Sequence, residues 1–159
     1  MPTYETVSFD FWFDCEWWNT PPSIEILLDQ EKIAYLNIEQ EQQISLTAHC
    51  DFGLHCLTII RSGKTDAETR ANLDGGYDTQ TLHLKKLCID RIDVRNLVWS
   101  RSTWAPEYPE PWFSQQIANH CRPEAVVIGE TTLGHNGTWR FEFQSPFYQF
   151  MIDCVRGKK

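Results

Sequence analysis

The chain has 159 residues, of which 42% are hydrophobic and 13% aromatic, so it can form the core of one compact domain and is not typical of a disordered protein. Its formal net charge of −8, from 22 acidic and 14 basic residues, opposes binding to a nucleic-acid backbone. No apolar run approaches the roughly 20 residues of a membrane-spanning helix, so we expect neither nucleic acid nor a membrane as a partner.

The first part of the chain is expected to form five short strands. Val7, Phe9, Phe11 and Phe13 alternate with more polar residues, which is the period of a strand with one buried face. Turn-forming residues separate the further strands, which we expect at about 23–28, 33–38, 44–48 and 54–60.

The second part is expected to be less regular. Residues 62–79 are polar and rich in glycine, which indicates a long surface loop. The apolar residues from Leu82 to Val98 predict two paired strands with a bend near residues 90–91. Three prolines predict an irregular, extended arm over 100–123, with a short helix at about 111–119 as the alternative.

The end of the chain resembles a hairpin, with strands at 130–133 and 138–143 and a turn at 134–137. Asn136 and Gly137 would supply the positive φ angles of a tight turn. Regularly spaced short strands predict an all-β fold, an antiparallel β-sandwich or jelly roll, in a single domain spanning residues 1–159. We expect helices to account for less than about a fifth of it.

Residues 1–5 lack the basic and apolar regions of a signal peptide, so we expect a cytoplasmic chain whose six cysteines are reduced. No CxxC, HExxH, GxSxG or phosphate-binding glycine motif occurs. Glu107 and Glu110 flank aromatic residues and would suit a glycosidase, but the favoured explanation is that they keep a proline-rich surface segment soluble. We therefore predict no enzyme and no cofactor, and leave open whether the glycine-rich loop Asp74–Asp78 binds calcium.

Seven tryptophans are the most unusual feature of the composition. Several aromatic residues lie in segments with turn or proline signals, where no core strand accounts for them: Trp17, Trp18, Trp104, Tyr108 and Trp112. Large aromatic side chains are enriched at protein interfaces and also stack on sugar rings, so we predict that these five residues bind a partner. The alternative is that several of them close the ends of the sandwich.

Four segments, 89–99, 107–112, 134–139 and 145–148, resemble uncharacterised virion structural proteins of tailed phages, particularly T4-like phages of cyanobacteria. The strands on either side of the long loop are also similar to the β-sandwich of carbohydrate-binding modules, notably the calcium-dependent xylan-binding type. These resemblances imply a virion component or a sugar-binding appendage.

The preferred hypothesis is a non-enzymatic virion protein, such as a capsid decoration, neck or tail component, assembled in the host cytoplasm. Its partners would be capsid or tail subunits, or further copies of itself, with Trp104, Tyr108 and Trp112 anchoring the contact from an extended surface arm. The alternative is a carbohydrate-binding module, which would place a few aromatic residues beside polar groups in an open groove and bind a polysaccharide.

Overall fold

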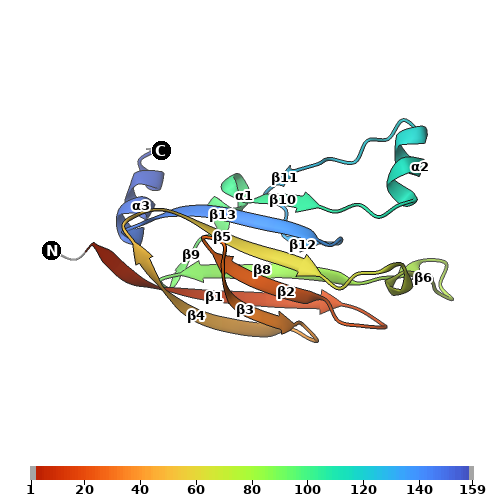
Figure 1. Cartoon of the computed structure of the whole chain (residues 1–159), viewed down its shortest axis with the longest axis horizontal. Coiled ribbons are helices and arrows are strands. Elements are labelled where there is room, and N and C mark those ends of the chain that lie inside the picture. Colours follow the sequence, from red (N-terminus) through yellow and green to blue (C-terminus); the bar gives the residue numbers. More distant parts are fainter. Residues whose placement is uncertain (1–2, 158–159) are drawn as a thin grey trace.

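The computed structural model describes residues 3–157 and contains two antiparallel sheets that pack face to face (Figure 1). The first sheet has the order β12-β8-β1-β4, with β9 beside β8: β1 (Tyr4–Glu16), β4 (Gln42–Asp51), β8 (Thr81–Ile89), β9 (Ile92–Asp93) and β12 (Thr132–Leu133). The second has the order β11-β10-β13-β5-β2-β3: β2 (Ser23–Leu28), β3 (Glu31–Asn37), β5 (Gly53–Ser62), β10 (Thr103–Pro106), β11 (Val127–Ile128) and β13 (Gly137–Ser145).

Short elements surround this sandwich: a 3-10 turn η1 (Asp66–Glu68), a small hairpin of β6 (Arg70–Ala71) and β7 (Tyr77–Asp78), and the helices α1 (Arg95–Arg101), α2 (Trp112–Ala118) and α3 (Phe147–Val155). Strands make up 51% of the chain and helices 16%. The expected all-β sandwich is therefore confirmed. Within residues 3–157, no helix is long and apolar enough to cross a membrane.

The core lies between the two sheets and follows the alternation of the sequence. Val7, Phe9, Phe11 and Phe13 of β1 are fully buried. Phe9 meets Phe143 of β13 edge to face, with ring centroids 5.7 Å apart, so aromatic contacts join the two sheets. On the outer face of β1, Trp12 lies beneath the ammonium group of Lys86, 4.9 Å from its ring centroid.

Three expectations about the second part of the chain need correction. Residues 95–101 form helix α1 and not the end of a strand, because Val94 and Val98 lie one helical turn apart and both face the core. The loop expected at 62–79 contains η1 and the β6–β7 hairpin. In the arm expected at 100–123, β10 joins the second sheet, and α2 matches the alternative helix at about 111–119.

The hairpin expected at 130–143 is wrong, because β12 pairs with β8 in one sheet while β13 pairs with β10 and β5 in the other. Neither Asn136 nor Gly137 has a positive φ. At Gly137 a Cβ atom would lie 2.5 Å from the Ala105 carbonyl oxygen and 2.9 Å from the Trp104 ring. The glycine therefore allows close contact between β10 and β13 instead of forming a tight turn.

All six cysteines fall within the described part of the chain and are free thiols. Burial, together with nearby carboxylates such as Asp29, raises the pKa of Cys50 to about 12. This thiol is therefore protonated at neutral pH and packs as a small apolar side chain.

Candidate functional site

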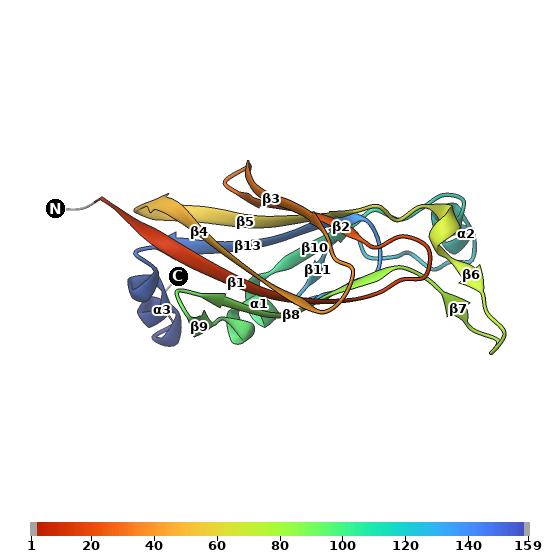
Figure 2. The same cartoon turned by 90° about the horizontal axis from the view of Figure 1, so that it is seen from below.

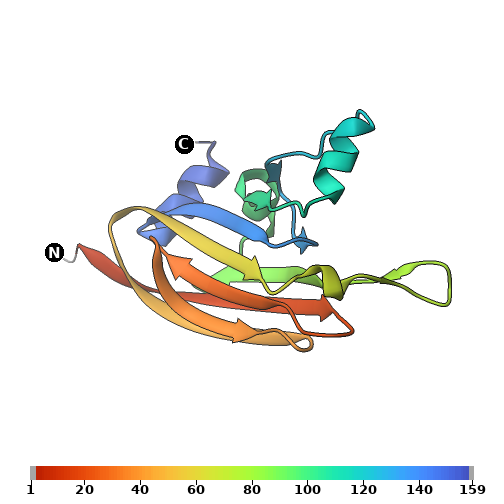
Figure 3. The same ribbon diagram turned by 45° about the vertical axis from the view of Figure 1, so that its right-hand side comes forward.

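A groove of about 460 Å³ lies at the end of the sandwich from which the β6–β7 hairpin and α2 project. Figures 2 and 3 show both projections at the same end of the molecule, with α3 at the opposite end. The residues that line the groove come from three chain segments: Lys64, Thr65, Thr69, Tyr77, Thr79, Glu107, Pro109, Trp112, His135 and Asn136. A volume in this range is typical of a small-ligand site.

One wall of the groove is aromatic. Trp112 and His135 line it, and Tyr108 packs against both of their rings, with centroids 5.6 and 5.2 Å away, and against Phe113 at 5.8 Å. The Tyr108 hydroxyl donates to the Glu124 carbonyl, which fixes the ring. Trp112 remains 38% exposed, so part of its indole is available to a ligand.

The opposite wall is the β6–β7 hairpin and its base. Tyr77 is 73% exposed there, beside the hydroxyls of Thr69 and Thr79, which are hydrogen-bonded to each other at 3.0 Å. Hydroxyl groups can both donate and accept hydrogen bonds. This wall therefore combines an exposed aromatic ring with groups that suit a polyhydroxylated ligand.

The floor of the groove is organised by Asn136. Its Oδ1 accepts from the Lys64 amide at 2.9 Å and from Nη1 of Arg61 at 3.0 Å, while its Nδ2 donates to the Lys64 carbonyl at 2.8 Å. Arg61 is 1% exposed and also donates to the Gln80 carbonyl. These bonds hold the chain segments of the floor in one arrangement before any ligand arrives.

Burial lowers the pKa values of three basic side chains at the base of the groove. It lowers the pKa of Arg61 to about 10, against the opposing attraction of Glu68. It also lowers the pKa of Lys64, with a further contribution from the charge of Arg61, and Lys64 donates to the Gly134 carbonyl. Burial and both cations lower the pKa of His135, which is therefore neutral at pH 7.

The residues predicted from the sequence fall into different places. Trp112 lines the groove and Tyr108 supports it from behind by ring contact, whereas Trp104 is 3% exposed in β10, so its expected position on a surface arm is wrong. Trp17 and Trp18 lie outside the groove lining, with their indole nitrogens bonded to the Glu39 and Glu68 carbonyls. The sequence does not single out Tyr77, Thr69, Thr79 and Asn136, because only the tertiary fold brings them to the groove that Trp112 lines.

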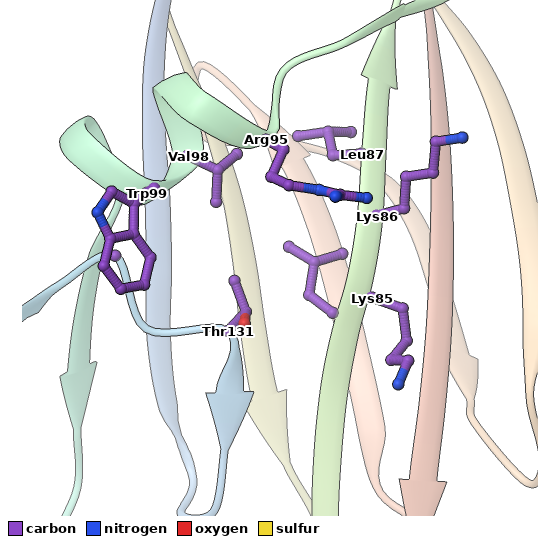
Figure 4. A pocket seen from close by; sticks show the side chains of 9 residues that line it. Lys85, Lys86, Leu87, Arg95, Val98, Trp99 and Thr131 are labelled. Atoms are coloured by element: carbon purple, nitrogen blue, oxygen red, sulfur yellow. The ribbon is translucent and has the colours of Figure 1, made fainter.

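A second cavity, of about 280 Å³, lies between β8, α1 and the segment at 129–131 (Figure 4). It occurs where the edge of β8 away from β1 lacks a strand partner, between its pairing with β12 at His83 and with β9 at Cys88. Leu84, Leu87 and Val98 form an apolar base, while the side chains of Lys85 and Lys86 extend from the side of β8 away from α1. With few polar groups to orient a hydrophilic ligand, this cavity is a weaker candidate than the groove.

Comparison with known proteins supports the fold class and nothing narrower. No family model matches the chain, and no curated protein matches it. A solved structure of vCBM60 in its selenomethionine form aligns with a TM-score of 0.53 and 9% identity, over 85% of this chain and 89% of that one. Its description concerns circular permutation as a link between two families of calcium-dependent carbohydrate-binding modules. A second structure, vCBM60 in complex with galactobiose, gives a TM-score of 0.51 and 9% identity over 84% and 96% of the two chains. The chain thus has the β-sandwich fold seen in these carbohydrate-binding modules.

The residues around the groove do not fit a calcium ion, which needs six to eight oxygen ligands. Among the described residues, no group of three His, Cys, Asp or Glu side chains is placed to hold a metal. In the Asp74–Asp78 loop, Asp78 Oδ2 is bonded to Arg70 Nε at 2.9 Å and Asp78 Oδ1 accepts from Asn72. The Asn72 Oδ1 accepts from the amides of Asp74 and Gly76, so it is also engaged within the loop.

Proposed function

We propose that this chain is a non-catalytic carbohydrate-binding protein whose ligand lies in the groove between the β6–β7 hairpin and α2. The observation that carries this proposal is that the exposed rings of Trp112 and Tyr77 line one cavity together with the hydroxyls of Thr65, Thr69 and Thr79. An aromatic face packs against the C–H face of a sugar ring, while the polar groups bond to its hydroxyls. The fold shared with vCBM60 structures agrees with this function.

Glycosidase activity is not supported by the groove. Hydrolysis of a glycosidic bond usually needs two carboxyl groups on either side of that bond. Among the described residues that line the groove, only Glu107 carries a carboxyl group. Glu110 instead accepts hydrogen bonds from the backbone amide and hydroxyl of Ser114 at the start of α2.

Assembly into a virion, as a capsid, neck or tail component, stays a prediction. The protein-binding arm expected for it loses one of its three anchors, because Trp104 belongs to the core. Tyr108 is half-buried against Trp112, which leaves Trp112 as the exposed anchor. Because this tryptophan also lines the groove, carbohydrate binding is the better-supported function.

The test is a titration of the whole chain against a panel of oligosaccharides and polysaccharides that includes galactobiose and xylan, followed by calorimetry and tryptophan fluorescence. Replacing Trp112 or Tyr77 by alanine should weaken binding of the best ligand by about tenfold or more, the scale expected of a buried aromatic anchor. Trp99→Ala is the matched control, because Trp99 is 75% exposed but lies outside the groove. Absence of binding to every saccharide, or equal losses for Trp99→Ala and Trp112→Ala, would contradict the proposal.

A further inference from the structure

The β6–β7 hairpin forms a wall of the groove although it is too short to be stable by itself. Each strand has two residues, and the pair forms a separate two-stranded sheet. Isolated two-stranded hairpins are marginally stable at best in water. Side-chain contacts must therefore hold Tyr77 and Thr79 in place.

Arg70 makes the contacts that fasten this hairpin. It pairs with Asp78 across the two strands, with Nε 2.9 Å from Oδ2. The same guanidinium lies over the indole of Trp18, 3.8 Å from the ring centroid. A planar guanidinium suits this combination because it can stack on an aromatic face while it donates to a carboxylate in its plane.

Trp18 connects this contact to the body of the protein. It lies in the segment between β1 and β2, and its Nε1 donates to the Glu68 carbonyl at 2.8 Å. Glu68 is 2% exposed, and its carboxylate accepts from Asn19 and Thr20 of the same segment. The hairpin is thus attached through Arg70 to an indole that is itself fixed.

A divalent cation at the same place would have to displace these contacts. Of the two carboxylates in the hairpin, Asp74 and Asp78, the second already has both oxygens engaged by Arg70 and Asn72. The fixed charge of Arg70 also repels a second cation nearby.

We infer that Arg70, and not calcium, holds the groove wall, and that saccharide binding in the groove is independent of divalent cations. The second part rests on the proposed function, while the first concerns the hairpin alone. Arg70 is accordingly a positioning residue: it acts on the ligand through the placement of Tyr77 and the threonines. This contrasts with the calcium dependence named for the vCBM60 families.

The first experiment needs no saccharide. Thermal unfolding of the whole chain is compared in EGTA and in roughly 10 mM calcium chloride, about tenfold above the weakest affinities of extracellular calcium modules. We expect equal midpoints, because a ligand that binds only the folded state would raise them. A higher midpoint in calcium would overturn the inference, whether or not any sugar binds.

Hydrogen exchange then measures the hairpin directly. Arg70→Ala should speed exchange of the amides at 69–79 by about fivefold, since it removes both an ion pair and a cation–π contact, and Arg70→Lys should have a smaller effect. Arg140→Ala, an exposed arginine on β13, is the matched control. Unchanged exchange in Arg70→Ala would overturn the role of Arg70.

The last arm repeats the titration with the best saccharide of the panel. Affinity should agree within about twofold between EGTA and calcium, and Arg70→Ala should weaken it by about fivefold, with partial recovery in Arg70→Lys. A requirement for calcium would overturn the inference while leaving carbohydrate binding intact. If no saccharide binds, the proposed function fails, and the calcium and exchange measurements still decide the role of Arg70.

Discussion

The two tryptophans of the proline-containing segment, Trp104 and Trp112, differ in how far they are buried. Trp104 pairs with Trp139 across β10 and β13, and Trp139 is fully buried. Trp112 begins α2 and keeps 38% of its surface exposed in the groove. The two indoles therefore contribute to different properties, the first to stability and the second to binding.

The change Trp104→Ala should destabilise the protein by about 3–5 kcal/mol, because it removes a buried indole and leaves a cavity between the strands. The change Trp112→Ala should alter stability by less than about 1 kcal/mol, since a partly exposed side chain loses few contacts. Chemical denaturation of both variants measures the difference. Equal losses for the two would show that Trp112 is also a core residue.

At this scale the sequence predicted apolar alternation well and aromatic exposure poorly. The faces of β1 follow from a period of two, which holds for any strand, so Phe9 and Phe13 could be assigned to the core. No comparable period exists near Pro106 and Pro109. Whether an indole there is buried depends on β13, which is distant in sequence, and local pattern alone does not reveal it.

At the scale of elements, tight turns also show that local sequence pattern does not determine long-range pairing. The pairs with positive φ are Asp29–Gln30, between β2 and β3, and Asp90–Arg91, between β8 and β9. Both turns were expected from the sequence as breaks between strands. The Asn136–Gly137 pair has the stronger turn signal, yet the chain passes there from one sheet to the other, because β8 and β5 each offer an edge for pairing.

Helix α3 was not predicted as a helix, and its first turn depends on a residue of β1. The Phe147 amide donates to the Glu5 carboxylate at 2.7 Å, and the Ser145 hydroxyl bonds to the same oxygen. Phe147 and Phe150 are buried against the end of the sandwich. A carboxylate at this position accepts a hydrogen bond from an otherwise unpaired backbone amide and interacts favourably with the helix dipole.

The change Glu5→Ala should therefore cost about 1–2 kcal/mol of stability and speed hydrogen exchange in α3, by analogy with the loss of a helix cap. Glu142→Ala is the control, because Glu142 is exposed on β13. Denaturation and exchange at 147–155 provide the readouts. If Glu5→Ala behaves like Glu142→Ala in both, then burial of the two phenylalanines alone fixes α3.

On the scale of the whole molecule, the two-sheet architecture follows from strand spacing and burial. The groove follows from two projections: α2, which the sequence predicts only as an alternative, and the β6–β7 hairpin, which it does not predict. Buried polar residues mark the place where these projections join the sandwich. Arg61, Glu68 and Gln80 are each at most 2% exposed. A chain with a net charge of −8 thus buries the Glu68 carboxylate within range of the charge of the buried Arg61 guanidinium.

This arrangement makes the stability of the whole protein sensitive to acid. Burial alone would raise the pKa of Glu68, but hydrogen bonds from Thr20 and Asn19 and the charge of Arg61 outweigh it and lower the pKa below the usual 4.5. In the unfolded chain Glu68 takes up a proton near its usual pKa, whereas the folded protein resists protonation. The stability from this carboxylate is therefore fully present above about pH 4.5 and is lost as pH falls through the lower, folded-state pKa.

We accordingly expect Glu68→Gln to lower the midpoint of thermal unfolding at pH 7, and the difference from the parent chain to shrink as pH falls toward about 3. At neutral pH the neutral amide removes the charge attraction to Arg61 and part of the hydrogen bonding, whereas in acid the parent chain loses the same charge. Calorimetric scans of both proteins across this range measure the difference directly, with Glu142→Gln as the exposed control. A difference that stays constant from pH 7 to pH 3 would mean that the hydrogen bonds of Glu68 stabilise the groove base and that its charge contributes nothing.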